Sequence, residues 1–360
     1  MLYELLYSLQ PYFFPFNVFR YITFRTSLAA ITALIVTFII APCIIRRLQR
    51  ISMTQQIRDD GPKTHYSKAG TPTMGGIIII LSITISTLMW GNFKNVYIWI
   101  MMVSLLGFGF IGFLDDYLKS VKRNPKGLKP CYKFGFQLVL AFAIGIFLYA
   151  NPKDPYNTIL SIPFFKKWLF DIGYFYIPFS VFVIVGSSNA VNLTDGIDGL
   201  AIGLVAIAVF ANVALVYVSG HAQFARYLQV LYLPGIGELT VFCGAMLGAS
   251  LGFLWYNSHP AEVFMGDVGS LSLGGALGTL AVITKHEIVL AVVGGIFVIE
   301  TISVVMQVAS FKLTGRRIFR MAPIHHHFEL KGWPEPKVIV RFWIAGIILA
   351  LFSLATLKLR

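Results

Sequence analysis

Charged residues are scarce in this sequence. Only 12% of its 360 residues are Asp, Glu, Lys or Arg, whereas 57% are hydrophobic, far from the shares of an ordinary soluble domain. Cysteine is scarcer still: Cys43, Cys131 and Cys243 are scattered and odd in number, without a CxxC spacing. This pattern predicts neither a disulfide framework nor a cysteine zinc site.

The start of the chain lacks the features of a cleavable signal peptide. Met1 to Phe19 is rich in aromatic residues and contains Pro11 and Pro15, but it has no basic beginning and no small-residue cleavage site. We expect this stretch to be retained and to lie at the membrane interface, where aromatic side chains are favoured.

Basic residues exceed acidic ones, giving a formal net charge of +13. They lie in short segments between apolar blocks rather than in a basic tail or domain, so we expect no nucleic-acid partner. Anionic membrane lipids and phosphorylated substrates are the partners that this distribution favours.

Long apolar blocks recur along the whole chain. A helix needs about 20 residues to cross the hydrocarbon core, and about ten blocks approach that length. They predict one domain, residues 1–360, with the fold of an all-α membrane protein, a polytopic helix bundle. The blocks span residues 23–45, 75–90, 97–114, 132–149, 172–187, 200–218, 239–255, 269–283, 288–311 and 338–357.

Most of the 29 Lys and Arg residues lie in the connections after the first, third and ninth blocks. Basic loops stay in the cytoplasm, so this face is predicted to be cytoplasmic and both termini periplasmic. Most acidic residues share that face, where we expect the active site. Gly244, Gly248 and Gly252 recur at helical spacing and predict close helix packing within the bundle; a homodimer contact is the alternative.

The string LDDYLK closes the third block with Asp115 and Asp116. Adjacent carboxylates are costly near a bilayer and repel each other, which raises one pKa or attracts a cation. Lys119 follows Asp115 by four residues and would share its helix face, within reach of a phosphate. The alternative interpretation is a solvated helix end.

A polar segment between the fifth and sixth blocks contains Asn192, Asp195 and Asp198 among glycines. Glycine lets a backbone approach a ligand closely, and Asn and Asp can bind a base or sugar. We interpret it as a binding loop, although either aspartate could instead cap the following helix.

A third segment places Asp267 just before the eighth block. A carboxylate there could cap the helix or bind Mg²⁺, which prefers oxygen ligands and substrate phosphates. Phe264 is a candidate for stacking on a base, or an interfacial anchor.

Three consecutive histidines, His325, His326 and His327, follow the ninth block in a basic segment with prolines. They cannot all bind one metal from a regular helix, and no metal-ligand spacing accompanies them. Hydrogen bonding to phosphate or sugar is the preferred interpretation.

Together these segments resemble the phospho-N-acetylmuramoyl-pentapeptide-transferase family, within the polyprenyl-phosphate N-acetylhexosamine 1-phosphate transferase superfamily. The likeness spans nearly the whole chain. It is carried, in order, by DDGPKTHYSKAGTPTMGG, LDDYLK, NAVNLTDGIDGL, NSHPAEVFMGDVGSLSLGG and MAPIHHHFELKGWPEPKVIVRFW.

The resemblance implies transfer of phospho-MurNAc-pentapeptide from UDP-MurNAc-pentapeptide to undecaprenyl phosphate at the bacterial inner membrane, with Mg²⁺ as cofactor and UMP and lipid I as products of this step of peptidoglycan synthesis. It implies Asp115, Asp116, Asp267, His325 and His326 as catalytic residues, with Asp267 as metal ligand. The implied substrate-binding residues are Lys68, Thr73, Lys119, Lys133, Asn192, Asp195, Asp198, Asn257, Phe264, Gln307 and His327.

Attack by the lipid phosphate, with Asp115 as base, and a two-step route through an aspartyl phosphate both fit these residues. Two other functions are open. A sister enzyme would use UDP-N-acetylglucosamine, although the string HHHFELKGWPE favours the muramoyl-pentapeptide donor. A secondary transporter is disfavoured, because the acidic motifs lie at helix ends on one face without an inverted repeat.

Overall fold

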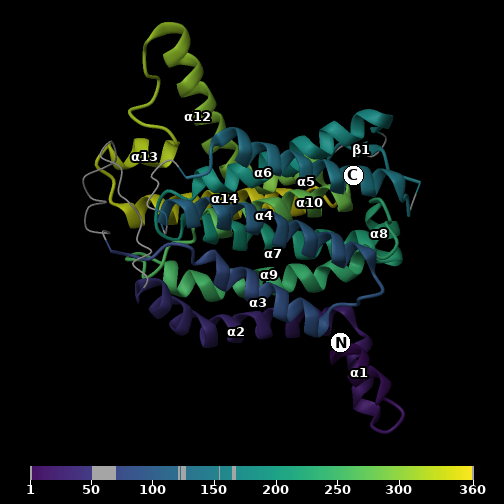
Figure 1. Cartoon of the computed structure of the whole chain (residues 1–360). Coiled ribbons are helices and arrows are strands. Elements are labelled where there is room, and N and C mark those ends of the chain that lie inside the picture. The colour runs from purple at the N-terminus through teal and green to yellow at the C-terminus, as the bar shows by residue number, and fades with distance from the viewer. Residues whose placement is uncertain are drawn as a thin grey trace.

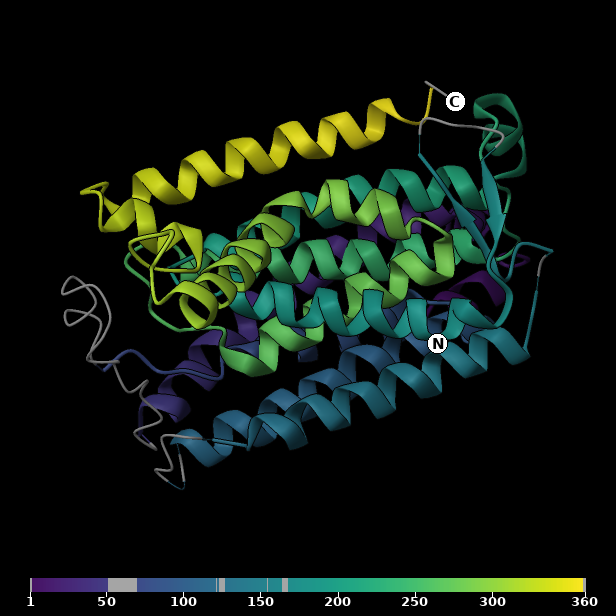
Figure 2. The same ribbon diagram turned by 90° about the horizontal axis from the view of Figure 1, so that it is seen from above.

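The computed structural model describes residues 2–50, 70–120, 122, 127–153, 155–163 and 168–358. These residues form a bundle of long helices running side by side, with one small hairpin (Figures 1 and 2). The long helices are α2 (Ile22–Arg50), α3 (Gly76–Trp90), α4 (Val96–Ser120), α5 (Pro130–Ala150), α6 (Tyr176–Thr194), α7 (Leu200–Gly220), α9 (Leu239–Asn257), α10 (Gly266–Thr284), α12 (Gly295–Thr314) and α14 (Glu335–Ala355).

Short elements connect the long helices. The antiparallel strands β1 and β2 pair Ile159 with Asp171. The short elements are α1 (Leu2–Ser8), η1 (Phe14–Arg20), β1 (Ile159–Ser161), β2 (Leu169–Asp171), η3 (Gly173–Phe175), α8 (Ala222–Leu228), η4 (Ile236–Glu238), α11 (Glu287–Val293) and α13 (Ile324–Glu329).

The predicted polytopic all-α architecture is confirmed. Within the described part of the chain, 9 helices are long and apolar enough to cross a membrane, and α3 is a shorter apolar helix. Each predicted block coincides with a helix, with one difference: the block at 288–311 is divided at Gly294 into α11 and α12. Glycine lacks a side chain and weakens a helix interior, which accounts for a break at this position.

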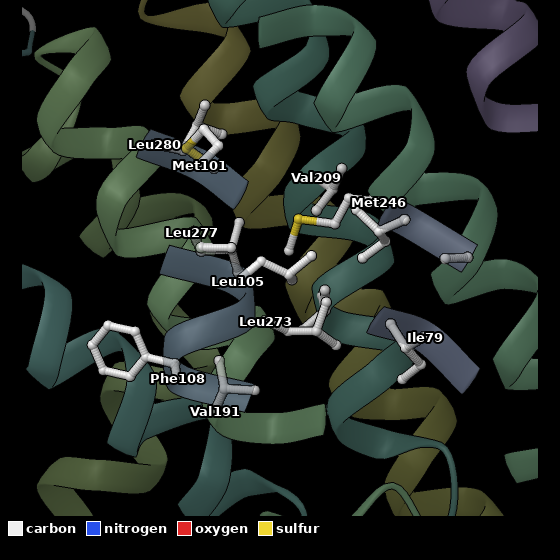
Figure 3. Packing of buried hydrophobic residues seen from close by; sticks show 14 of the residues in the cluster. Ile79, Met101, Leu105, Phe108, Val191, Val209, Met246, Leu273, Leu277 and Leu280 are labelled. Carbon is white, nitrogen blue, oxygen red and sulfur yellow. The ribbon is translucent and has the colours of Figure 1, made fainter. Parts of the chain in front are cut away.

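Helix α10 forms the centre of the bundle, and every residue from Val268 to Thr284 is buried. It packs against α4 and α6, with α3 alongside. Figure 3 shows Leu273, Leu277 and Leu280 of α10 near Leu105 and Phe108 of α4. This packing fixes the ends of α4 and α10 relative to each other.

The glycines of α9 do pack within the chain. A side-chain carbon at Gly244 or Gly248 would overlap the backbone of Thr26 or Ala30 in α2, and one at Gly252 would lie 2.8 Å from Thr37. Small residues here let the two helices approach closely. Since these glycines serve a contact between α2 and α9, a homodimer through them is not needed to explain the pattern, and dimerisation stays a prediction.

The two ends of the bundle differ. At one end the last turns of α4 and α6, the first turn of α10 and the short helix α13 come together, while the chain termini lie toward the other end (Figures 1 and 2). Helix α12 projects away from the bundle before α13 returns the chain to it (Figure 1). The end that contains α13 carries the predicted site.

Candidate active site

Asp115 and Asp116 lie in the last turns of α4 and are almost fully buried, with 2% and 5% of their surface exposed. Asp115 Oδ1 accepts a hydrogen bond from the Leu128 amide at 2.7 Å. The chain reaches this position through Gly127, which has φ +58, and a side chain there would overlap Asp115 and Lys119. Backbone from the α4–α5 connection therefore holds the first carboxylate in place.

Asp267 belongs to the first turn of α10 and comes from a different helix than the aspartate pair. The two helices touch at Gly112 of α4, where a side-chain carbon would overlap the carbonyl group of Asp267. Because Gly112 lies one turn before Asp115 and Asp116, this contact brings all three carboxylates together.

Two lysines bridge Asp115 and Asp267. Lys119 Nζ lies 2.7 Å from Asp115 Oδ2 and 2.8 Å from Asp267 Oδ2. Lys133 Nζ, from the start of α5, lies 3.1 Å and 2.8 Å from the same two oxygens. The predicted common face of Asp115 and Lys119 is confirmed. The two ammonium groups neutralise the repulsion between the carboxylates.

Asp116 and Asp195 instead bind the beginning of α10. Asp116 Oδ2 accepts a hydrogen bond from the Val268 amide at 3.1 Å, and Asp195 accepts one from the Gly266 amide. The first amides of a helix have no partner within the helix and favour negative charge. Carboxylates from α4 and from the end of α6 thus supply the hydrogen-bond acceptors that the first amides of α10 lack.

Neither predicted aspartate cap occurs. Helix α7 begins after Gly199, with φ +72 and no side-chain cap, and the cap position of α10 is Met265. The capping interpretations of Asp195, Asp198 and Asp267 are therefore wrong. Burial, followed by the charges of Asp267 and Asp198, raises the pKa of Asp195 to about 8.

Asn192 completes this group of polar side chains. Its Nδ2 donates to Asp267 Oδ1 at 2.6 Å and to Ser270 Oγ at 2.8 Å. The side chain thereby fixes the second oxygen of Asp267, while the lysines contact the first. Ser270 was not a predicted site residue; it follows Asp267 by three residues, which places both on one helix face.

Asp198 belongs to a second group of polar side chains, together with His259 and Glu335. Its Oδ2 is 3.2 Å from His259 Nδ1 and accepts the Ala261 amide at 3.2 Å. Glu335 Oε1 accepts the Asp198 amide at 3.0 Å, and Glu335 Oε2 lies 3.6 Å from His259 Nδ1. Among the residues that the structure describes, these three side chains form the group whose ligand atoms lie within 4.8 Å of one another.

Asn257 joins two loops of the candidate site. Its Oδ1 accepts the Gly199 amide at 3.0 Å and its Nδ2 donates to the Val263 carbonyl at 2.8 Å. Since the side chain is buried and both polar atoms are engaged, Asn257 positions the loops around Gly199 and Val263.

Phe264 and Thr73 lie beside α10. The Phe264 amide donates to the Pro72 carbonyl and its carbonyl accepts the Gly75 amide, each at 2.8 Å. The aromatic ring is half-buried, and its predicted role in stacking on a base stays a prediction. Thr73 is buried next to Gly266, where a side-chain carbon would lie 3.0 Å from its hydroxyl oxygen. Lys68 lies outside the described residues.

The three histidines of α13 have different partners. His325 is fully buried, and its Nδ1 lies 3.2 Å from Glu300 Oε1 in α12. His326 Nδ1 lies 2.6 Å from Glu329 Oε2. His327 Nδ1 accepts the Arg320 amide at 3.1 Å, and its pKa is lowered by burial and by the charges of Lys331 and Arg320. Nδ1 thus faces a carboxylate in His325 and His326 and a backbone amide in His327.

Gln307 lies further along α12, and its amide holds the following loop. Its Oε1 accepts the amides of Ile318 and Phe319, and its Nε2 donates to the Phe319 carbonyl. These bonds orient the segment that leads to the histidines, so the structure connects Gln307 to the site through the backbone.

The donor atoms at the centre of the site fit a hard divalent cation. Asp115 and Asp267 direct Oδ2 toward the same two ammonium groups, which marks a position where positive charge contacts both carboxylates. Mg²⁺ prefers one or two carboxylates of this kind together with substrate phosphates.

Sequence reasoning missed residues that act through tertiary contacts. Ser270, His259 and Glu300 are far in the sequence from the residues that they contact, which are Asn192, Asp198 and His325. Glu300 had one detectable signal: it is an acidic residue inside a long apolar block, a position that is costly without a partner.

Comparisons with known proteins agree with this geometry. Residues 97–285 match the family model described as glycosyl transferase family 4, and residues 68–80 match phospho-N-acetylmuramoyl-pentapeptide-transferase signature 1. The chain is 72% identical to a phospho-N-acetylmuramoyl-pentapeptide-transferase of Thermodesulfovibrio yellowstonii and 58% identical to one of Citrifermentans bemidjiense, in both cases over 100% of each chain.

The chain folds as a polytopic bundle with acidic residues at the end of α4 and the beginning of α10, and it matches this family model. These findings define a membrane-embedded glycosyl transferase of family 4. Within that class, the sequence identity over the full length and the signature identify the family. It belongs to the phospho-N-acetylmuramoyl-pentapeptide-transferase family, so the resemblance noted in the sequence is confirmed.

Proposed function

We propose that this protein transfers phospho-MurNAc-pentapeptide from UDP-MurNAc-pentapeptide to undecaprenyl phosphate, forming lipid I and releasing UMP for peptidoglycan synthesis. The observation that carries the proposal is the shared contact of Asp115 and Asp267 with Lys119 and Lys133. Carboxylates and ammonium groups from three helices meet there, as the binding of phosphates and a cation requires.

The site lies at the cytoplasmic face of the bacterial inner membrane in this proposal, and both termini are periplasmic. Basic segments after α2, α4 and α12 support this orientation, because such loops remain in the cytoplasm. A nucleotide sugar can reach that face from water, while the lipid carrier reaches it from the bilayer.

The two lysines bind phosphate oxygens. Lys119 keeps 40% of its side chain exposed and Lys133 keeps 18% exposed, so both ammonium groups remain accessible while they contact the carboxylates. When a substrate phosphate draws a lysine toward itself, Asp115 is left free to accept the remaining proton of the lipid phosphate, whose oxygen then attacks the sugar-linked phosphorus.

Mg²⁺ is the proposed cofactor, with Asp267 as its ligand and Asp115 beside it. The ion would neutralise charge on the diphosphate as UMP leaves. Asn192 holds the other oxygen of Asp267 at 2.6 Å, which orients the carboxylate, and Asp116 holds the first turn of α10 through the Val268 amide.

Asn192, Asp195 and Phe264 line the nucleotide pocket in this proposal. The half-buried ring of Phe264 offers a face for the uracil base. Asp195, with its pKa raised to about 8, is mostly protonated at neutral pH and can donate a hydrogen bond to a base or ribose oxygen. The remaining proposed substrate-binding residues that the structure describes adjoin this pocket or hold its loops: Thr73, Asp198, Asn257, Gln307 and His327. Lys68 is proposed as a further donor-binding residue from the sequence alone.

The histidines of α13 are proposed to contact the donor through their Nε2 atoms. His325 and His326 both direct Nε2 toward Gly196, since a side-chain carbon there would overlap the first and lie 3.3 Å from the second. Gly196 adjoins Asp195, which supports a role for both rings as further catalytic residues near the donor diphosphate.

Donor-dependent release of UMP by the purified protein tests the proposal. We expect UMP from UDP-MurNAc-pentapeptide only when undecaprenyl phosphate is present, none from UDP-N-acetylglucosamine, and loss of the reaction when EDTA removes divalent cations. Turnover of UDP-N-acetylglucosamine instead would point to the sister enzyme. Uptake of a solute into vesicles without UMP release would point to a transporter.

A further inference from the structure

Helix α12 is mostly exposed but contains one buried acidic residue. Its buried residues are Ile296, Phe297, Glu300 and Ser303, and Glu300 is 0% exposed. A buried carboxylate in an apolar helix loses its hydration, so it needs a partner of opposite charge or a hydrogen-bond donor. The partner that the structure provides is His325.

The two side chains face each other in the interior, and the His326 ring lies 4.1 Å from the His325 ring. His325 Nδ1 lies 3.2 Å from Glu300 Oε1, and both residues are 0% exposed. Among the described residues, the ring nitrogens and the carboxylate oxygens have no hydrogen-bond partner, so the ion-pair contact between Nδ1 and Oε1 is what joins the two side chains. A buried pair of this kind contributes little to stability compared with apolar packing. Its effect on the orientation and protonation of the His325 ring is therefore the more informative property.

The pair determines which nitrogen faces the substrate loop. With Nδ1 directed at Glu300, Nε2 points to Gly196, where any side-chain carbon would overlap it. Gly196 directly follows Asp195, whose carboxylate binds the first turn of α10. The free nitrogen of a fully buried ring is therefore aimed at the loop that the proposed function assigns to the donor.

We propose that Glu300 is a positioning residue that keeps a proton on Nδ1 of His325 and so presents Nε2 to the nucleotide-sugar donor. A carboxylate attracts the proton of the nearer ring nitrogen, and the hydrogen bond on one nitrogen determines the state of the other. Without the carboxylate the ring is free to rotate and to change tautomer. This inference rests on the proposed function, because it identifies the ligand of Nε2 as the donor.

The substitutions Glu300→Gln and Glu300→Leu test whether Glu300 acts as a hydrogen-bond acceptor or only fills space. The amide oxygen of glutamine still accepts the Nδ1 proton, so we expect Glu300→Gln to retain kcat within about fivefold. Leucine fills similar space without an acceptor, and we expect kcat to fall roughly a hundredfold, as a misplaced catalytic group does. Full activity of Glu300→Leu would overturn the proposal.

A double-mutant cycle with His325→Ala tests whether Glu300 acts through the ring. If it does, Glu300→Leu in the His325→Ala background causes no further loss, because the ring is already absent. Losses that multiply would show that Glu300 acts independently of His325 and would contradict the inference.

The tautomer itself has a readout that does not depend on turnover. Solid-state NMR of protein labelled at the histidine ring nitrogens, with the His325 signal assigned by its loss in His325→Ala, should show a protonated Nδ1 in the wild-type protein. We expect the proton to move to Nε2 in Glu300→Leu. An unchanged His325 signal would overturn the proposal even if activity fell.

Glu287→Gln is the matched control for removing a buried carboxylate. Glu287 is buried beyond the far end of α10 and contacts the Tyr176 hydroxyl group. We expect unchanged kcat and an unchanged His325 signal in this variant. An inactive wild-type protein would contradict the proposed function, whereas an active wild-type protein with an equally active Glu300→Leu variant would contradict only the role of Glu300.

Discussion

Lys133 Nζ lies 2.8 Å from Asp267 Oδ2, although the two residues are 134 positions apart and begin different helices. The same nitrogen lies 3.1 Å from Asp115 Oδ2. Lys133 thus provides positive charge at the point where two carboxylates would otherwise repel each other. In the proposed function it also binds a substrate phosphate.

Replacing Lys133 with methionine should leave a folded protein with little activity. The substitution keeps an aliphatic side chain but removes the donor to phosphate, and loss of one such donor costs roughly a hundredfold or more in kcat. UMP release by the purified protein measures the effect. Lys129→Met, at the exposed residue before the same helix, is the control and should remain within about twofold of wild type, as surface changes usually do; equal losses in both would show that only the charge of the loop matters.

Substitutions of Asp116 and Asp267 should differ in their effect on cation affinity. We expect both Asp116→Asn and Asp267→Asn to be folded and nearly inactive. Mn²⁺ binding, measured by electron paramagnetic resonance as a substitute for Mg²⁺, should weaken at least about tenfold in Asp267→Asn and remain close to wild type in Asp116→Asn. Asp116 contacts the Val268 amide and Asp267 is the proposed ligand; weakened binding in both variants would make Asp116 a ligand as well.

The contact between α4 and α10 should not tolerate a side chain at Gly112. Gly112→Ala places a carbon against the Asp267 carbonyl group, and overpacking costs about 1–3 kcal/mol while it moves the carboxylates apart. We expect a lower unfolding temperature and strongly reduced UMP release. Gly135→Ala in α5 meets nothing within 4 Å and should be neutral; a stable, active Gly112→Ala protein would show that the helices can separate without harm.

The fold was predictable because apolar block length and basic connections are local signals. Ten blocks were expected and ten helices match them, with one break at Gly294. The aspartates, Lys119 and the histidines were predictable because polar residues at the ends of apolar helices are unusual. The contacts of Asp116 with Val268, Asn192 with Ser270 and Glu300 with His325 were not, because they depend on how α10, α12 and α13 pack.

Stability should depend on pH through Glu287. Burial raises the pKa of Glu287 from an ordinary value of 4.5 to about 7, so the folded protein holds a proton that the unfolded chain loses. Its contribution is fully present below about pH 4.5 and is lost as pH rises to about 7, on the order of 3 kcal/mol. The free energy of unfolding in detergent measures this, and Glu287→Gln should flatten the profile between those pH values; an unchanged profile would contradict the assignment.

Both chain termini lie toward the end of the bundle away from the acidic cluster (Figures 1 and 2). A fluorescent protein or an affinity tag fused at either terminus would therefore sit on the side opposite to the acidic cluster, which is the proposed entrance for the nucleotide sugar. Fusions at either position can be used for purification and imaging without obstructing that entrance.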